Sequence, residues 1–294
     1  MTTSILTEQT YLPARASDLP NGRWLILAPH ADDETFGMGG AIALAVQSGT
    51  QVDVLIMTDG AKGGDDADLV AIREHEARQA IQALGCHNIN FLRQADRELK
   101  VSETLIERLA ESIRTGDYSA VFFPSPVEPH PDHRATAQIG WEALRKAEFS
   151  ATPISYEIST QGPCNALVDI SSAVEKKAEV MRLYASQLTQ NAYVERILGL
   201  NAARAWSLPL DVTHAEAFYL WTPADQPLSA QLWGIQYVQQ SGYALPAIET
   251  LVSIIVRTMN RPDMLREAIR SVAHQTHTSI ELVVVNDGRD DFAA

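Results

Sequence analysis

The sequence predicts an α/β protein with a doubly wound, mostly parallel sheet and helices on both faces of that sheet. Two observations support this prediction. Short apolar runs alternate with helical patterns through the first half of the chain, and such alternation is typical of parallel sheets with right-handed crossovers. The runs Trp24–Ala28 and Ala120–Phe123 are apolar throughout, which is typical of strands buried on both faces. We therefore expect a Rossmann-like arrangement.

The expected elements follow the chain in order. Strands are predicted at 23–28, 52–58, 89–92 and 119–123, and helices at 37–47, 68–84, 102–114 and 132–146. Gly85 is the type of residue found just past a helix end, and residues 105, 106, 109 and 113 place apolar side chains on one helix face. Further on, strands are expected at 154–158, 166–170 and 218–221, and helices at 172–187 and 191–206.

Three segments are expected in the domain organisation. Residues 1–222 form the main domain, residues 223–249 form a linker that contains several prolines and glycines, and residues 250–294 begin a second domain. The last segment has strand patterns at 252–256 and 281–285 and a helix pattern at 261–273. One such unit cannot bury both faces of its sheet, so we interpret it as the opening fragment of a larger domain.

Composition limits the classes of partner. The chain has 294 residues, 46% of them hydrophobic, and a formal net charge of −14 without any basic cluster. Nucleic acids and anionic membrane surfaces are therefore not expected partners. Two cysteines make no disulfide framework, and neither a signal peptide nor a run of membrane-spanning length is visible. A cytoplasmic protein is expected, and its oligomeric state cannot be predicted.

Two short segments combine imidazole and carboxylate groups. Pro29–Glu34 follows the first predicted strand, and His130–His133 follows the strand that ends at Phe123. Ligands bind at the carboxyl ends of strands in open parallel sheets, so both segments are expected at one edge. The three adjacent acids 32–34 would repel one another unless a cation or hydrogen bonds compensated them. Histidine with carboxylate suits a divalent transition metal, most often zinc.

The spacing suggests a ligand set. His30 and Asp33 are three residues apart at the entry to a helix, so both side chains can reach one point, and His133 can supply a third ligand. Two histidines, one carboxylate and a water make an open catalytic zinc site, in which the water pKa falls to about 7. Asp32, next to a ligand, is placed to accept the proton of that water.

Two further residues of the second segment have expected roles. A carbonyl group attacked by the metal-bound hydroxide develops negative charge on its oxygen. His130, when protonated, can stabilise this oxyanion and then protonate a leaving amine. Asp132 can orient a histidine through a hydrogen bond. The structural alternative is that the histidines cap helices and that the acids favour a helix N-terminus. The occurrence of both segments after buried strands favours the metal site.

These residues resemble the PIG-L/LmbE family of zinc-dependent N-deacetylases, whose signature is a PHADDE-like segment with a later HPDH-like segment. The resemblance extends over about residues 20–222. It implies removal of acetyl from an N-acetylated sugar or sugar conjugate, with Zn²⁺, or another divalent metal such as Fe²⁺, as cofactor. It implies the same ligands, His30, Asp33 and His133, the same base, Asp32, and His130 as the electrophilic or acid histidine.

Weaker similarities to the same family add candidate substrate-binding residues. Thr58–Gly60 with Gly63 resembles a glycine loop beside the substrate, and Arg73 with Glu76 resembles a family helix. Gly60, Lys62 and Arg73 are the resulting candidates, Lys62 for an anionic group. Segments 184–187 and 216–218 resemble later family segments. Taken singly, each of these similarities is more often structural than functional.

The end of the chain resembles a family-2 glycosyltransferase of GT-A fold. The similar segments are 252–258, 271–275 and 285–288. In such enzymes the residue matching Asp287 contacts the nucleotide base, whereas the metal-binding DxD and the catalytic base lie further on and are missing here. No transferase activity is therefore expected from this chain.

Three functional hypotheses follow. The first is a metal-dependent N-deacetylase with a small-molecule or glycoconjugate substrate. The second is an accessory domain of a bifunctional glycosyltransferase, and the third is a non-catalytic carbohydrate-binding module. Intact ligand and catalytic positions favour the first hypothesis. The sequence does not identify the N-acetylated substrate.

Overall fold

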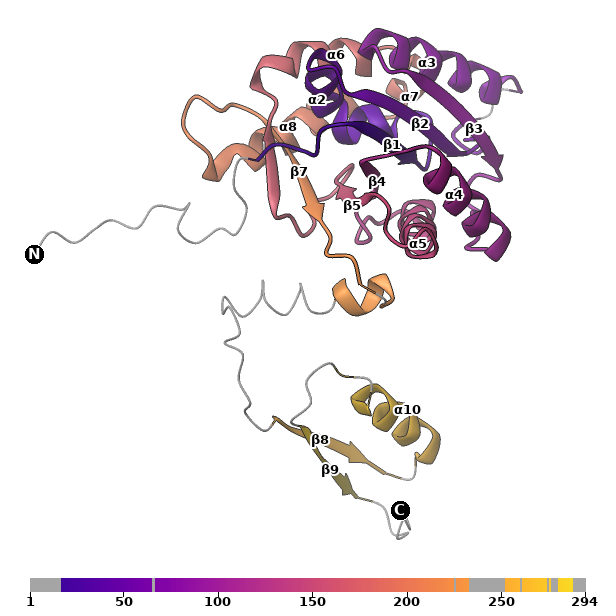
Figure 1. The fold of residues 1–294 in the computed structure, drawn as a ribbon, viewed down its shortest axis with the longest axis vertical. Coiled ribbons are helices and arrows are strands. Elements are labelled where there is room, and N and C mark those ends of the chain that lie inside the picture. The colour runs from indigo at the N-terminus through magenta and orange to yellow at the C-terminus, as the bar shows by residue number, and fades with distance from the viewer. Residues whose placement is uncertain are drawn as a thin grey trace, which may run out of the picture. The chain divides into compact units, whose positions relative to one another are not determined.

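The computed structural model describes residues 17–64, 67–224, 226–232, 252–259, 261–273, 275 and 280–287. The chain divides into two compact units, residues 1–236 and residues 237–294 (Figure 1). Most of the predicted linker lies outside the described residues. Within it, the carbonyl of Gln226 accepts a hydrogen bond from the Trp141 indole at 2.9 Å, and Leu228 is buried in the core of the first unit. The predicted domain ranges stay a prediction.

The first unit is built on a seven-stranded sheet with the strand order β3-β2-β1-β4-β5-β7-β6. The strands are β1 Arg23–Ala28, β2 Gln51–Thr58, β3 Asn88–Gln94, β4 Ala120–Pro124, β5 Thr152–Tyr156, β6 Ala166–Asp169 and β7 Ala215–Leu220. Neighbours from β3 to β5 are parallel, and β7 is antiparallel to β5 and β6. The predicted mostly parallel α/β sheet is thus confirmed.

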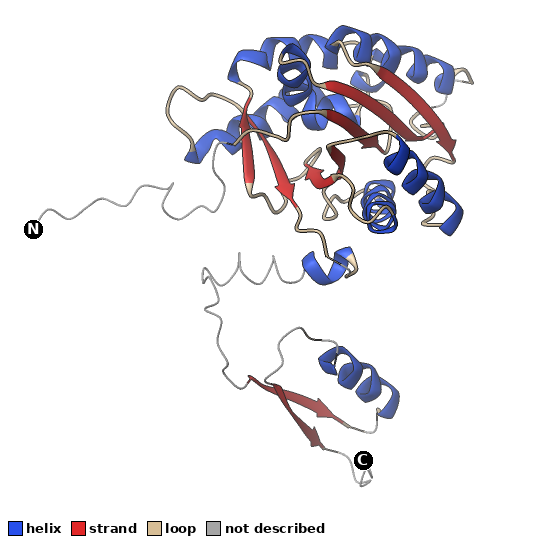
Figure 2. Cartoon of the chain, in the orientation of Figure 1, coloured by secondary structure: helices blue, strands red, loops and turns tan. Residues whose placement is uncertain are grey.

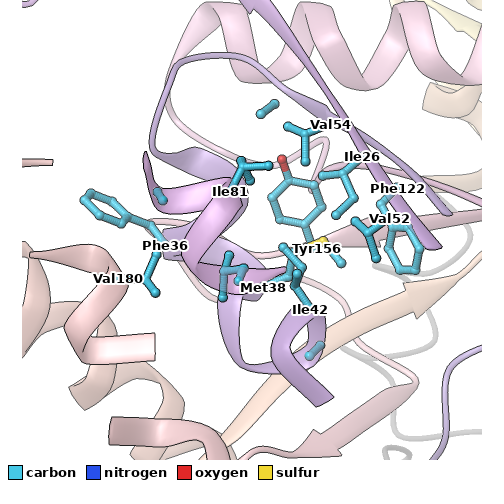
Figure 3. Packing of buried hydrophobic residues seen from close by; sticks show 14 of the residues in the cluster. Ile26, Phe36, Met38, Ile42, Val52, Val54, Ile81, Phe122, Tyr156 and Val180 are labelled. Atoms are coloured by element: carbon cyan, nitrogen blue, oxygen red, sulfur yellow. The ribbon is translucent and has the colours of Figure 1, made fainter. Parts of the chain in front are cut away.

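Helices cover both faces of this sheet (Figure 2). They are α2 Asp33–Gln47, α3 Leu69–Leu84, α4 Glu103–Thr115, α5 Pro131–Lys146, α6 Val174–Met181, α7 Ala185–Leu188 and α8 Tyr193–Arg204. Successive side chains of a strand point to opposite faces. Ile26 therefore joins the cluster under α2, α3, α6 and α8, part of which Figure 3 shows, whereas Leu25 and Leu27 join the cluster under α4 and α5.

Local signals explain several helix ends. Ser102 caps α4, because its hydroxyl accepts a hydrogen bond from the Leu105 amide at 3.4 Å. Gly85 ends α3 with φ +78°, a conformation that glycine adopts without steric penalty. The expectation of one helix over 172–187 is wrong: a 3₁₀ turn, Ser171–Ala173, leads into α6, and the chain breaks before α7. Tyr184 lies in that break, and its buried hydroxyl donates to Glu34.

Helix α2 begins at Asp33, earlier than the predicted start at 37, and it is kinked at Met38, where φ is −142°. The kink leaves amides of the following turn without helical partners. The Glu216 carboxylate on β7 accepts hydrogen bonds from the Gly40 and Ala41 amides, at 2.9 and 2.7 Å. Lys177 pairs with Glu216 at 2.7 Å, and both side chains are fully buried. Glu216 and Lys177 thus hold the kinked part of α2 against β7 and α6.

The second unit contains a strand, a helix and a strand, as predicted. They are β8 Val252–Thr258, α10 Pro262–Ala273 and β9 Ile280–Asn286. The two strands are parallel, in register from Val252 with Ile280 to Thr258 with Asn286. Apolar side chains such as Ile255, which is 68% exposed, remain uncovered on these strands.

Candidate metal centre

Both histidine segments begin where the sheet reverses its strand order. β1 and β4 are parallel neighbours; the chain adds β2 and β3 on one side of this pair and β5 on the other. Such a switch point opens a crevice at the carboxyl ends of the strands. The loop and helix start after β1 carry residues 29–34, and those after β4 carry residues 130–133. The topology therefore brings together two segments about a hundred residues apart.

Two imidazoles converge on one carboxylate oxygen. His30 Nδ1 lies 3.1 Å and His133 Nε2 lies 3.3 Å from Oδ2 of Asp33. The backbone N–H of His30 donates to the same oxygen at 2.9 Å. All three residues are buried. The structure thus brings together the three predicted metal ligands. Nδ1 of His30 and Nε2 of His133 are the ring nitrogens that face the shared oxygen.

Other carboxylates face the far nitrogens of these rings. His30 Nε2 lies 3.3 Å from Asp132 Oδ2 and 3.3 Å from Asp96 Oδ1. His133 Nδ1 lies 3.6 Å from Glu128 Oε2. A carboxylate behind a ligating histidine fixes the ring orientation and raises its basicity. The predicted orienting residue, Asp132, directs its carboxylate at His30.

Sequence reasoning missed Asp96 and Glu128. Neither lies in a histidine segment, so no local pattern marks it. Asp96 follows β3 by two residues, and Glu128 follows β4 by four. Their position after strand ends is the one signal that could have identified them. Glu128 is fully buried, and its carboxylate accepts hydrogen bonds from the Ile158 amide at 2.8 Å and the Ser159 amide at 3.0 Å.

Asp32 is held in an unusual backbone conformation before α2. Its φ is +151° and its ψ is −29°, a combination that residues with a Cβ rarely adopt and that is associated with functional sites. Glu34 Oε2 accepts its backbone N–H at 3.3 Å, and Arg73 Nη2 donates to its Oδ2 at 3.2 Å. Burial raises the pKa of Asp32 to about 7, against the opposing effect of Arg73.

His130 lies beside the other two rings. Its ring centroid is 4.7 Å from that of His30 and 5.1 Å from that of His133. Its Nδ1 accepts the Asp132 amide at 3.2 Å at the start of α5. Burial and the neighbouring histidines lower the pKa of His130.

The cluster has the charge pattern of a cation site. Burial lowers the pKa of His133, but Asp33 and Glu128 outweigh burial and raise that pKa to about 9. Burial would raise the pKa of Asp33, yet His133 and His30 keep it well below its ordinary value. Buried carboxylates need a compensating positive charge. The nitrogen and oxygen donors that converge here suit a divalent transition metal, so the residues present fit such an ion.

A cavity of about 480 Å³ opens onto this cluster, within the size range of small-molecule sites. Its lining includes the metal-centre residues His30, Asp32, Asp33, Asp96, His130 and His133. The other lining residues are Phe36, Gly63, Arg73, Arg97, Pro129, Pro131, Ile158, Ser159, Gln187, Gln190, Tyr193 and Ile197. Of the candidate substrate residues, Arg73 lies on the lining. Gly60 lies behind it, its carbonyl accepting from Arg73 Nη1 at 3.2 Å, and Lys62 pairs with the exposed Glu98 at 2.5 Å.

Comparison with known proteins gives two family matches. Residues 25–144 match the model of the GlcNAc-PI de-N-acetylase family, PIG-L. The matched range includes both histidine segments. Residues 253–294 match the model of glycosyl transferase family 2.

Several of the similar proteins are named as deacetylases. Diacetylchitobiose deacetylase of Thermococcus kodakarensis is 29% identical over 190 residues, 58% of this chain and 71% of the relative. A probable N-acetyl-α-D-glucosaminyl L-malate deacetylase 2 of Bacillus anthracis is 26% identical over 55% of this chain and 80% of the relative. The structure of N,N′-diacetylchitobiose deacetylase from Pyrococcus horikoshii superimposes with a TM-score of 0.60 at 25% identity, over 68% of this chain and 83% of that chain.

Proposed function

Because residues 25–144 of this chain belong to the PIG-L family, we propose that its first unit removes the acetyl group from an N-acetylated sugar or sugar conjugate. The observation that carries the proposal is the convergence of His30 Nδ1 and His133 Nε2 on Asp33 Oδ2, on the lining of a cavity of about 480 Å³. The deacetylases of N-acetylglucosamine compounds among the similar proteins support the same reaction class. The reaction consumes water, cleaves an amide C–N bond and yields acetate and an amine.

His30, Asp33 and His133 would hold a divalent metal, Zn²⁺ or another ion such as Fe²⁺. When bound, the metal supplies Lewis acidity and lowers the pKa of water. Asp96 and Asp132 keep His30 oriented through Nε2, and Glu128 does the same for His133. These contacts leave Nδ1 of His30 and Nε2 of His133 directed at the shared centre.

Asp32 is the proposed general base. Its carboxylate lies among the cavity residues, and a pKa raised to about 7 suits a group that takes up a proton near neutral pH. Arg73 donates to Asp32 Oδ2 and thereby holds the Asp32 carboxylate in one orientation. His130, on the same cavity wall, is the proposed donor to the carbonyl oxygen and to the departing amine.

The substrate is proposed to be a small molecule or a glycoconjugate. No helix in the described part of the chain is long and apolar enough to cross a membrane. We make no proposal for glycosyl transfer, because the match to that family is confined to residues 253–294.

Acetate release tests this proposal. Metal-free protein and protein reloaded with Zn²⁺ or Fe²⁺ are incubated with N-acetylglucosamine, N,N′-diacetylchitobiose and sugar conjugates, and acetate is quantified. Activity is expected only with metal. The Asp32→Ala variant should keep stoichiometric metal and lose about 10²- to 10⁴-fold in kcat, the range for a general base, whereas His30→Ala and His133→Ala should lose the metal. Metal loss of equal size in all three variants would contradict separate roles for base and ligands.

A further inference from the structure

Arg97 lies on the cavity lining next to the metal-centre histidines. It directly follows Asp96, whose carboxylate faces His30 Nε2 at 3.3 Å. Its own backbone N–H donates to Asp132 Oδ2 at 2.7 Å. The backbone of Arg97 is therefore tied to two carboxylates that contact a proposed metal ligand, and its position relative to the centre is fixed.

The backbone of Arg97 adopts a disfavoured conformation. Its φ is +60°, in the left-handed region that a Cβ makes unfavourable. Such conformations persist when surrounding contacts enforce them, and they cluster at ligand-binding sites. The hydrogen bond to Asp132 is one such contact. The loop after β3 thus keeps Arg97 on the cavity lining through a backbone conformation that the surrounding contacts enforce.

The guanidinium of Arg97 is available for binding. The residue is exposed, and the described part of the chain provides no hydrogen bond or ion pair to its side chain. The nearby cations differ, because Arg73 pairs with Asp32 and Lys62 pairs with Glu98. In a chain with a net charge of −14, Arg97 is thus a cavity-lining cation to which the described residues offer no acidic partner.

We propose that Arg97 binds an anionic group, a phosphate or a carboxylate, carried by the N-acetylated sugar substrate. This inference rests on the proposed function, which places the sugar in the same cavity. A guanidinium offers planar paired donors that match both anions with two parallel hydrogen bonds. The cavity, at about 480 Å³, is in the size range of whole small-molecule sites, so a substituted sugar is a suitable occupant.

The substrate preference of an Arg97→Gln variant tests the inference. We would measure kcat/KM for acetate release from two neutral sugars, N-acetylglucosamine and N,N′-diacetylchitobiose, and two acidic sugars, N-acetylglucosamine 1-phosphate and N-acetylmuramic acid. The ratio of acidic to neutral kcat/KM is expected to fall about 10- to 100-fold in the variant, the range for one charge-assisted interaction. Most of the fall should be in KM. Arg97→Lys should retain part of the preference, as a point charge without the paired geometry.

Arg108→Gln on α4 is the matched control, because it removes the same charge from an exposed position outside the cavity lining. It should leave the ratio unchanged. A loss confined to the phosphate sugar or to N-acetylmuramic acid would identify the anion that Arg97 binds. An unchanged ratio for both acids in Arg97→Gln would overturn the inference while the deacetylase proposal stands.

Calorimetry separates the two proposals. N-acetylglucosamine 1-phosphate is titrated into metal-free wild type and metal-free Arg97→Gln, so that the phosphate cannot bind a metal. Weaker binding to the variant, by about tenfold or more, would support the Arg97 site even if the metal-loaded protein released no acetate from any sugar. Equal binding to both proteins, together with an unchanged kinetic ratio, would reject the site.

Discussion

Glu128 shows how a single residue outside the histidine segments can control the centre. Its carboxylate is fully buried, accepts hydrogen bonds from the Ile158, Ser159 and Thr160 amides, and faces the far nitrogen of His133 at 3.6 Å. Such outer carboxylates typically account for 10- to 100-fold in metal affinity. We therefore expect Glu128→Gln to raise the metal dissociation constant by about that factor in a chelator-competition titration. The exposed Glu111→Gln on α4 is the control, and equal affinity of the two variants would refute the role of Glu128.

The stability of the metal-free protein should depend on pH through His133. Its folded pKa of about 9 lies above the ordinary value of 6.5, so the folded state binds this proton more tightly than the unfolded state does. The stabilisation is complete below pH 6.5 and is lost as pH rises to about 9. We expect the free energy of unfolding in urea to fall across that window, with a smaller fall in His133→Gln. A free energy that rises over the same range would contradict this assignment.

At the scale of elements, the start of α2 depends on close packing. A Cβ at Gly37 would lie 2.5 Å from the Tyr156 ring and 2.7 Å from the Glu157 carbonyl, whereas one at Gly199 in α8 would meet nothing within 4 Å. Gly37→Ala should therefore lower the free energy of unfolding by about 1–3 kcal/mol. Gly199→Ala should raise it by about 0.5–1 kcal/mol, because alanine favours the helix. Denaturant unfolding checks both, and shifts of the same sign would contradict this account of α2.

The elements also show what the sequence could and could not predict. The mostly parallel strands and the approach of the 29–34 and 130–133 segments at one edge of the sheet followed from apolar runs and adjacent motif residues. The kink at Met38 did not, because the partner of the freed amides, Glu216, lies far away in the sequence. The break between α6 and α7 was missed because Tyr184 fits a helical pattern, while its hydroxyl bonds to Glu34 across the fold. Contacts of this kind are set by tertiary packing, which has no local signature.

At the scale of the whole molecule, the metal centre should act as a stabilising ligand of the first unit. Trp24, Trp141 and Trp221 are buried in the first unit, and the sequence of residues 237–294 has no tryptophan. The change in tryptophan fluorescence on denaturation therefore reports the unfolding of the first unit. Metal at a hundred times its dissociation constant should add about 2.7 kcal/mol to the free energy of unfolding. Chelation should remove this increment, and the His30→Ala variant should not show it. An increment that persists in His30→Ala would place the stabilising ion elsewhere.

The position of the bound ion tests the central claim most directly. Crystals of the full chain grown with the metal would be measured at its absorption edge, and the anomalous peak would be located. We expect one peak about 2.0–2.2 Å from His30 Nδ1, His133 Nε2 and an oxygen of Asp33. A peak on the opposite side of the His30 ring, at Nε2 between Asp96 and Asp132, would contradict the account.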